Sequence, residues 1–444
     1  LTPEERLQAA LVPDWERPYK LPENWCWTTV GAINQYVGIS ADPTKAKNKT
    51  FELYSVPSSA DNYPEIVLGA DIGSTKQSVK KGDVLLCKIN PRINRVWKVS
   101  KYTDHSLLAS SEWIVIRNSG LISNYLMWCF RSPYFRGYML SNVSGVGGSL
   151  MRAQPKFVQG YPVPVPPLAE QQRIVDRIES LFAKLDEAKE KAQAVVDSFE
   201  NRKAAILHKA FTGELTAKWR EEHGVGMESW EHHQFSDLCA IVRGGSPRPA
   251  GDPRYYDGNI PFMKVADITR NDSPYVSKVE YSIKEEGLKK TRMVEANTLL
   301  LTNSGATLGV PAITTIRTTF NDGIAAFIGL DIDSLLFYYY FWTSKTAFLR
   351  SINMGAAQPN LNTKLIGEVE IDVPQTAERV EIARVLNALL SKEQQAKEAA
   401  EAVLDQIDLM KKSILARAFR GELGTNDPSE ESAVKLLKRG LEKK

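Results

Sequence analysis

The sequence predicts an α+β protein in which two α/β globules are separated by a pair of long antiparallel coiled-coil helices that form an internal repeat. Three observations lead to this fold class. The chain has 444 residues, and at about 150 residues per domain this length favours two or three domains. A composition of 43% hydrophobic and 25% charged residues is typical of a globular protein and excludes disordered or collagen-like chains. The third observation is a duplicated segment.

The duplicated segment relates residues 165–215 to residues 373–423 at a constant offset of 208 residues, without a gap. The two copies share 22 identities in 51 positions, whereas chance gives about three at typical amino-acid usage. Both copies open on Val-Pro and close on Ala-Phe-x-Gly-Glu-Leu. A match of this length indicates an internal duplication.

Each copy carries apolar residues at alternating steps of four and three, which is the heptad pattern of a helix that packs along one seam. Proline just before each predicted helix and glycine just past its end are the expected helix boundaries. The pattern predicts two unbroken helices of about 43 residues that pack on each other; the alternative is that each helix covers its own domain. One polar residue interrupts each seam, and it either sets the register, meets a partner or is solvated. The seams are Ile174, Ile178, Leu181, Leu185, Ala188, Ala192, Val195, Phe199, Arg202 and Ile206, then Ile382, Leu386, Leu389, Glu393, Ala396, Ala400, Val403, Ile407, Met410 and Ile414.

The segments outside the helices differ in charge. Residues 21–165 carry 16 basic and 9 acidic side chains, a net charge of +7, whereas residues 228–372 carry 14 basic and 17 acidic side chains, a net charge of −3. Only the first globule has the electrostatic footprint of a phosphate-binding surface. The predicted boundaries are an N-terminal segment (1–20), a first globule (21–165), a central helix (166–215), a linker (216–227), a second globule (228–372), a C-terminal helix (373–423) and a tail (424–444).

Short apolar runs predict strands at 83–87 and 113–116 in the first globule and at 298–301 and 325–328 in the second. The two globules are weakly related, since Trp25 near the start of the first corresponds to Trp230 near the start of the second. The aromatic run 337–342 is interpreted as the buried face of a core helix rather than as a base-stacking platform.

The longest apolar run, 335–342, is too short to cross a bilayer, which needs about 20 residues, so no membrane association is expected. The four cysteines are scattered without metal-ligand or disulfide-framework spacing. This pattern favours a cytoplasmic location.

Three motifs resemble one family. They are VPVPPLAEQQRIV (163–175) at the entry to the first helix, RGGSPRPAGDPRYYDGNIPFMKVADI (243–268) at the opening of the second globule, and GAAQPNLNTKLIGEVEIDVP (355–374) at its exit. Together with the order of globule and heptad helix, repeated once, they resemble the specificity subunit of type I restriction-modification systems over essentially the whole chain.

The resemblance implies a non-catalytic, sequence-specific DNA-binding subunit. Each recognition domain would read one half of a bipartite, asymmetric site in double-stranded DNA, and the helices would set the spacer. It also implies docking of two copies of an adenine-N6 DNA methyltransferase subunit on the helices, and association with endonuclease/translocase subunits. No cofactor is expected in this chain, because S-adenosylmethionine, ATP and magnesium would be bound by those partner subunits.

Candidate DNA contacts are basic and amide side chains in loops, because arginine and lysine recognise guanine and asparagine and glutamine recognise adenine in the major groove. Two clusters occur in the first globule and three in the second, and the alternative is that their members are ordinary solvated loop residues. In the first globule the candidates are Lys88, Asn90, Arg92, Asn94 and Arg95, then Arg152 and Gln154; in the second they are Arg243, Ser246 and Arg248, then Asn303 and Ser304, then Gln358, Asn360 and Asn362.

The repeated Ala-Phe-x-Gly-Glu-Leu ends are candidates for partner docking, with a plain helix-stop turn as the alternative. The residues concerned are Phe211, Gly213, Glu214, Phe419, Gly421 and Glu422.

Catalytic motifs are not found. The sequence has no Gly-x4-Gly-Lys-Ser/Thr phosphate loop, and its five histidines lack ligand partners at useful spacing, so neither catalytic residues nor a metal site is predicted. Two other functions stay open at this point: a methyltransferase or nuclease that acts alone, and a coiled-coil scaffold without DNA selectivity.

Overall fold

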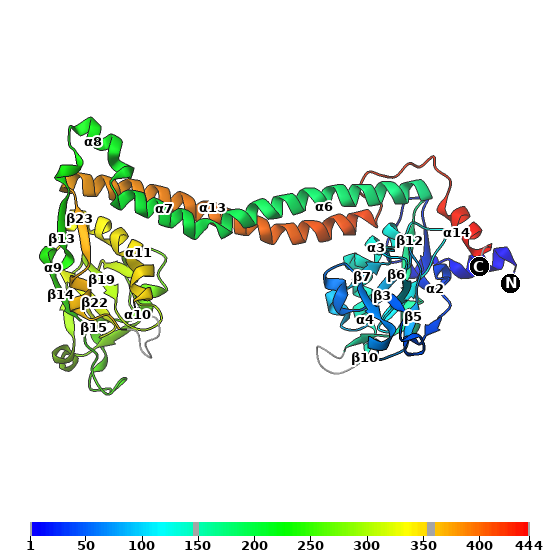
Figure 1. Ribbon diagram of the computed structural model, residues 1–444, viewed down its shortest axis with the longest axis horizontal. Helices are drawn as coiled ribbons and strands as arrows, with labels where there is room; N and C mark the ends of the chain where they lie inside the picture. Colours follow the sequence, from blue (N-terminus) through cyan, green and yellow to red (C-terminus); the bar gives the residue numbers. More distant parts are fainter. Residues whose placement is uncertain (1, 145–150, 353–359, 443–444) are drawn as a thin grey trace. The chain divides into compact units, whose positions relative to one another are not determined.

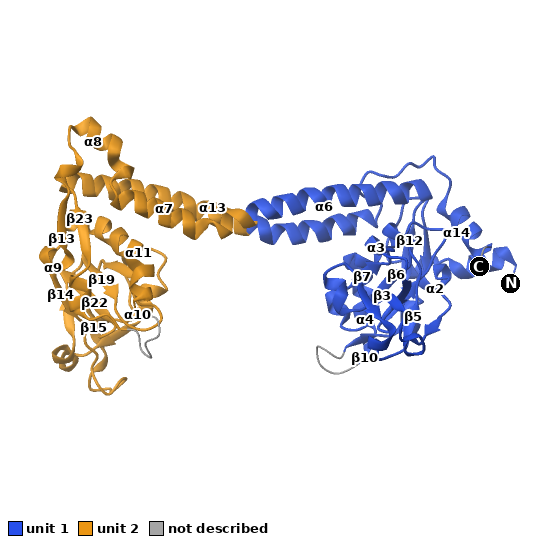
Figure 2. Cartoon of the chain, in the orientation of Figure 1, with its two compact units in different colours: residues 1–192, 402–444 blue, residues 193–401 orange. Residues whose placement is uncertain are grey.

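The computed structural model describes residues 2–144, 151–352 and 360–442. The chain forms two compact units, one made of residues 1–192 and 402–444 and the other of residues 193–401 (Figure 2). Each unit contains one mixed α and β globule and one stretch of paired helices (Figure 1). The predicted fold class is therefore confirmed.

The first globule is built around strands that the apolar runs predicted. Strand β6 (Val84–Cys87) is fully buried and pairs antiparallel with β9 (Trp113–Ile116) and with β7 (Val96–Lys98). A five-stranded sheet lies beside this three-stranded one, in the order β2 (Ser40–Ala41), β5 (Lys76–Ser78), β8 (Ser106–Ala109), β3 (Thr50–Tyr54) and β4 (Glu65–Leu68). The remaining elements are α1 (Pro3–Ala10), β1 (Cys26–Thr29), α2 (Val30–Ile33), α3 (Ser123–Arg131), α4 (Pro133–Ser141), β10 (Val143–Ser144), β11 (Arg152–Ala153), α5 (Pro155–Val158), β12 (Pro162–Val165) and α14 (Ala433–Glu442).

The second globule repeats the central arrangement. Strand β19 (Thr298–Thr302) is buried and pairs antiparallel with β22 (Ile324–Ile328) and β20 (Pro311–Thr314), as β6 does with its neighbours. Helix α11 (Leu335–Ser351) packs on this sheet and buries Phe337, Phe341 and Trp342, which confirms the core interpretation of the aromatic run. The other elements are β13 (Glu231–Gln234), α9 (Phe235–Leu238), β14 (Ala240–Arg243), β15 (Tyr256–Met263), α10 (Val265–Thr269), β16 (Tyr275–Val276), β17 (Tyr281–Ile283), β18 (Arg292–Val294), β21 (Thr318–Phe320), α12 (Thr363–Gly367) and β23 (Glu370–Val373).

The second helical copy is a single helix, α13 (Thr376–Ala418), as predicted. The first copy is not, because it is divided at Ser198 into α6 (Leu168–Asp197) and α7 (Phe199–Phe211). The Ser198 hydroxyl donates to the Ala194 carbonyl at 2.5 Å, and Nη2 of Arg202 donates to the Val195 carbonyl at 3.2 Å. These side-chain donors compete with the backbone for helical carbonyls, which a heptad pattern does not reveal.

The paired helices run antiparallel within each unit. In the first unit Asp186 of α6 meets Lys411 of α13, with Oδ1 and Nζ 2.5 Å apart. In the second unit Arg202 of α7 meets Glu393 of α13, with Nε and Oε2 2.7 Å apart. The two polar residues that interrupt the seams therefore face each other, which supports the register-setting interpretation.

The seam is narrower than the heptad pattern predicts. Ile174, Ile382 and Ile407 are buried, but Val403 is 41% exposed and Met410 is 45% exposed. Two helices can bury only one stripe between them, so seam residues that point past the partner stay in contact with solvent.

A buried glutamate stands at the start of each paired helix, and the two glutamates are 208 residues apart, like the helices themselves. Glu170 accepts hydrogen bonds from Trp25 Nε1 at 2.7 Å, Asn426 Nδ2 at 2.9 Å and Thr425 Oγ1 at 3.3 Å. Burial raises the pKa of the Glu170 carboxyl, and the three neutral donors offset part of that effect.

Glu378 occupies the same position in the second unit but has a charged partner. It accepts from Arg220 Nη1 at 2.6 Å, Thr216 Oγ1 at 2.7 Å and Trp230 Nε1 at 3.1 Å. The equivalence of Trp25 and Trp230 is thus structural, since each indole binds the glutamate of its own unit. Part of the predicted linker forms helix α8 (Ala217–His223), which supplies Arg220.

Neutralising the two glutamates is expected to have unequal effects. Glu378→Gln leaves the buried Arg220 guanidinium without a carboxylate, which costs about 3 to 5 kcal/mol. Glu170→Gln disturbs hydrogen bonds from neutral donors and should cost about 1 to 2 kcal/mol. Amide hydrogen exchange, read separately for each unit, measures both free energies of opening. Equal losses in the two units would contradict this account.

Candidate DNA interface

The two candidate clusters of the first globule form one surface. The loop that follows β6 pairs with β11, because the Asn90 amide donates to the Met151 carbonyl at 2.8 Å and the Ala153 amide donates to the Lys88 carbonyl at 2.8 Å. An isolated bridge joins Ile89 to Arg152. The sequence placed these clusters 57 or more residues apart, and only the fold brings them together.

Within this surface Arg92 and Arg152 are the accessible cations. Arg92 is exposed on a single turn of 3-10 helix (Pro91–Ile93). The side chain of Arg152 is 51% exposed and its Nη2 lies 3.2 Å from Glu112 Oε1. Lys88, Arg95 and Gln154 are half-buried at the edges of the same surface.

Asn90 and Asn94 determine the backbone conformation of the loop that follows β6. Asn90 and Asn94 have φ values of 48° and 54°, the left-handed region that asparagine tolerates better than most residues. Asn94 Nδ2 donates to the Arg131 carbonyl at 3.1 Å, so this amide already has a structural partner. Arg136 of α4 was missed by the sequence reasoning; its guanidinium donates to the Arg92 carbonyl and thus joins the surface from a distant helix.

All three residues of the first cluster of the second globule, Arg243, Ser246 and Arg248, contact Asp322. Ser246 Oγ donates to Asp322 Oδ1 at 2.6 Å, Arg248 Nη2 lies 3.7 Å from Asp322 Oδ2, and Arg243 Nε donates to the Asp322 carbonyl at 2.6 Å. The Arg248 side chain is 71% exposed. A search for cations and amides could not find Asp322, because its role is to hold the loop that carries them.

Two glycines allow this loop to lie against the neighbouring strands. The Gly244 amide donates to the Ile324 carbonyl at 3.0 Å, and the Gly245 amide donates to the Phe320 carbonyl at 3.1 Å. A Cβ on Gly244 would meet the Asn321 carbonyl oxygen at 2.2 Å, and one on Gly245 would meet the Lys290 carbonyl oxygen at 2.3 Å. The Gly-Gly of the motif is therefore required by close backbone approach.

The other two clusters of the second globule also meet. A bridge joins Ser304 to Asn360, and the Leu361 amide donates to the Asn303 carbonyl at 2.7 Å. Asn360 is exposed, but the Asn303 side chain is fully buried and so offers no surface to a base in this conformation. Asn362 caps α12 by accepting from the Leu365 amide at 2.8 Å. Gln358 lies outside the described residues.

The two globules thus share one arrangement: the loop after the central strand is bridged to a segment that precedes the paired helix. The bridged residues Arg152 and Asn360 stand at the same 208-residue offset as the helices. The duplication therefore extends into the candidate surfaces, although their side chains differ.

The candidate docking residues form helix-stop turns. Gly213 and Gly421 have φ values of 79° and 76°, the left-handed conformation typical of a residue that ends a helix. Phe419 is fully buried against Tyr125, with ring centroids 5.4 Å apart, so its side chain serves the core. Phe211 is half-buried against Phe337 and Phe341, and Glu214 and Glu422 are exposed.

Among residues 2–144, 151–352 and 360–442, no group of three or more His, Cys, Asp or Glu side chains could hold a metal ion. His232 instead contacts Asp372, with Nδ1 and Oδ1 2.8 Å apart, which raises the pKa of its imidazole. No helix in this part of the chain is long and apolar enough to span a bilayer.

Comparison with known proteins shows which family the chain resembles. The family model for the type I restriction modification DNA specificity domain matches twice, at residues 38–196 and 227–402. The EcoKI specificity subunit of Escherichia coli K12 is 21% identical over 91% of this chain and 90% of its own length. The StySPI specificity subunit of Salmonella potsdam is 25% identical over 68% of this chain, and the match spans 65% of that relative.

A crystal structure of the HsdS subunit from Thermoanaerobacter tengcongensis has the same fold, with a TM-score of 0.68, 21% identity, and coverage of 92% of this chain and all of that one. The chain is a DNA-recognition subunit rather than an enzyme that acts alone. It belongs to the type I restriction-modification DNA specificity family.

Removing the Asp322 carboxylate is expected to release the loop of residues 244–248 in the second globule without unfolding the globule. Asp322→Ala should increase amide hydrogen exchange at residues 244–248 about tenfold, because Ser246 and Arg248 lose their shared acceptor. Asp252→Asn is a matched control. The Asp252 carboxylate contacts Arg254, which lowers the pKa of that carboxyl to about 2, and it does not contact the residues that bind Asp322. Equal exchange in both variants would show that Asp322 does not hold the loop.

Proposed function

We propose that each globule reads one half of a bipartite, asymmetric site in double-stranded DNA, and that the paired helices set the distance between the halves. The observation that carries the proposal is the duplicated arrangement with unlike side chains. Arg152 in the first globule and Asn360 in the second occupy equivalent bridged positions. Arginine favours guanine and asparagine favours adenine in the major groove, so two equivalent surfaces would read different sequences.

In the first globule the reading surface comprises Arg92, Arg152 and the loop that follows β6. In the second it comprises Arg248, Asn360 and the loop held by Asp322. Support comes from their exposure and from their place in loops fixed by backbone pairing on both sides. Residues buried or used as caps, such as Asn303 and Asn362, would position these surfaces without touching bases.

The same proposal assigns partners. Two copies of an adenine-N6 methyltransferase subunit would dock on the helices, and endonuclease/translocase subunits would join the complex. S-adenosylmethionine, ATP and magnesium would be bound by those subunits. The exposed carboxylates of Glu214 and Glu422 beside the glycine turns are the accessible part of the repeated helix ends, and they are the first choice for such contacts.

Half-site specificity is expected to separate by globule. In the complex with its methyltransferase subunits, Arg92→Ala with Arg152→Ala should relax the sequence preference at one half-site, with a loss of about 1 to 3 kcal/mol for each base contact. Arg248→Ala should act on the other half-site only. Selection from random duplexes, followed by sequencing, measures both preferences.

A general loss of affinity with both preferences intact would identify these arginines as phosphate contacts. Loss of selectivity at both half-sites from either variant would contradict the assignment of one half-site to each globule.

The spacer is expected to follow the length of the paired helices. Residues 184–190 of α6 face residues 406–412 of α13, since Asp186 pairs with Lys411 in this stretch. Removing both segments shortens the pair by about 10 Å, which equals about three base pairs at 3.4 Å each. The preferred spacer should shorten while the half-site sequences stay the same. An unchanged spacer in the same selection would contradict the proposed role of the helices.

A further inference from the structure

We infer that each globule reads one G·C base pair with an arginine and a carboxylate that act together. The two side chains are Arg152 and Glu112 in the first globule, and Arg248 and Asp322 in the second. Glu112 and Asp322 determine specificity by accepting a hydrogen bond from the amino group of cytosine. The inference rests on the proposed reading of half-sites, and it adds two acidic residues and the base pair that they select.

The two carboxylates lie in the same region of their globules. Glu112 directly precedes β9 and Asp322 lies two residues before β22, and these strands pair with the central strands β6 and β19. Nη2 of Arg152 lies 3.2 Å from Glu112 Oε1, and Nη2 of Arg248 lies 3.7 Å from Asp322 Oδ2. The arginines come from different segments, β11 and the loop that follows β14, so the duplication alone does not explain the shared arrangement.

Both ion pairs are accessible to a ligand. The Glu112 side chain is 27% exposed and the Asp322 side chain is 44% exposed, and the arginine of each pair is more exposed than its carboxylate. An ion pair in contact with water contributes little to folding stability, because the solvent screens the charges and the long side chains lose conformational freedom. The stability of the fold therefore does not account for the two pairs.

The Glu112 carboxylate retains an unused acceptor. Its Oε1 accepts from Arg152, whereas its Oε2 is buried and has no hydrogen-bond donor in the part of the chain that the structure describes. Buried polar atoms without a partner are rare in folded proteins. A carboxylate that served the fold alone would bind donors with both oxygens, so Glu112 keeps the capacity to accept from a group outside the chain.

The geometry of an arginine beside a carboxylate matches the major-groove edge of a G·C pair. Guanine offers two adjacent acceptors, O6 and N7, and cytosine offers the N4 amino group as a donor. O6 and N4 are hydrogen-bonded to each other, so they lie about 2.9 Å apart, close to the separation of the charged atoms in both ion pairs. In an A·T pair the amino group lies between two single acceptors, so a guanidinium finds no two adjacent acceptors there.

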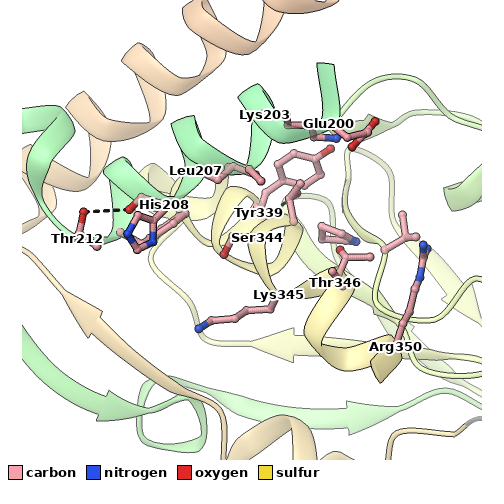
Figure 3. Close-up of a pocket in the computed structure, with 16 residues that line it drawn as sticks. Glu200, Lys203, Leu207, His208, Thr212, Tyr339, Ser344, Lys345, Thr346 and Arg350 are labelled. Carbon is pink, nitrogen blue, oxygen red and sulfur yellow. Dashed lines mark hydrogen bonds between the residues drawn. The ribbon is translucent and has the colours of Figure 1, made fainter. Parts of the chain in front are cut away.

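The carboxylates also oppose binding to DNA of any sequence, because a negative charge beside each arginine repels phosphates. Cations elsewhere in the chain lack such a neighbour. Lys203, His208 and Lys345 line a groove of about 730 Å³ between α7 and α11 (Figure 3), and no carboxylate of the described residues lies within ion-pair distance of them. The fold therefore does not place an acid beside every cation, and the pairing is a property of the two reading surfaces.

The test uses the full chain in complex with its methyltransferase subunits. Selection from random duplexes gives the two half-sites, and fluorescence anisotropy at fixed salt gives the affinities for the selected duplex and for a random one. Each half-site should contain a G·C pair. Glu112→Gln should lower the preference for that pair at least about fivefold in one half-site, because a neutral amide accepts more weakly than a carboxylate. It should also raise the affinity for the random duplex about threefold, because a charge that repels phosphates is lost. Asp322→Asn should have both effects, with the other half-site affected.

Glu16→Gln and Asp272→Asn are matched controls. They make the same chemical changes at exposed carboxylates outside the loops assigned to DNA, one in each unit, and should leave the base preferences and both affinities unchanged.

The two variants keep the local structure. Asp322→Asn retains an acceptor for the Ser246 hydroxyl, so hydrogen exchange at residues 244–248 should not increase. Glu112→Gln is the decisive variant, because Arg152 is the only hydrogen-bonding partner of that side chain among the described residues, and the amide oxygen can still accept from it.

The inference is overturned if either half-site lacks a G·C pair. It is also overturned if Glu112→Gln leaves the base preference unchanged, as expected for a carboxylate that only positions Arg152, or if its affinities for the selected and the random duplex fall together. Arg152→Ala, measured alongside, separates this failure from that of the proposed function. If that variant still relaxes its half-site, only the role of the carboxylate is wrong; if it does not, the proposed reading of half-sites fails as well.

Discussion

The buried glutamate at the start of each paired helix is the interaction on which the rest of the structure depends. It joins three segments that are far apart in the chain: the beginning of a helix, the tryptophan near the start of a globule, and the residues that follow the other helix. In the first unit these are Glu170, Trp25 and Asn426; in the second they are Glu378, Trp230 and Arg220. A buried carboxylate without donors costs several kcal/mol, so only the arrangement that brings all donors together is stable. The glutamate thereby fixes how each globule leaves its helix.

The two halves of the duplication differ where the buried glutamate does not constrain them. The helix ends, the buried glutamates and the central antiparallel strands keep the same geometry in both units. The donors to the glutamate differ, because all are neutral in the first unit and one, Arg220, is charged in the second, yet both sets satisfy the carboxylate. The loops beyond the central strands keep only their backbone bridges, and their side chains share little. The packing of the helices and strands constrains their sequence strongly, whereas the loops are constrained weakly. The loop side chains, and with them the DNA sequence that is recognised, can therefore change without a change of fold.

Local sequence patterns predicted the helices and strands well, but they predicted poorly which segments contact each other. Strand β9 has the predicted bounds, and α13 is the predicted single helix, because apolar period and boundary residues are local signals. The break at Ser198 was missed because it arises from side-chain hydrogen bonds, and the exposure of Met410 was missed because a heptad pattern does not say how many helices share the seam. The candidate clusters were found from residue type alone. That Arg152 meets Ile89, that Asp322 gathers three loop residues, and that Asn303 is buried follow from pairings across 20 to 80 residues, which no local window contains.

The charges of the two globules point to two different ways of holding DNA. Affinity that comes from phosphate contacts depends on the release of counterions and falls steeply with salt. The first globule, with a net charge of +7, can supply such contacts broadly, whereas the second, at −3, has its exposed Arg248 beside the Asp322 carboxylate. Under the proposed reading of half-sites, the second globule would therefore gain more of its affinity from hydrogen bonds to bases and from the shape of its loop. Such a protein would be attracted to DNA mainly by the first globule, while the second would add discrimination once the duplex is already close.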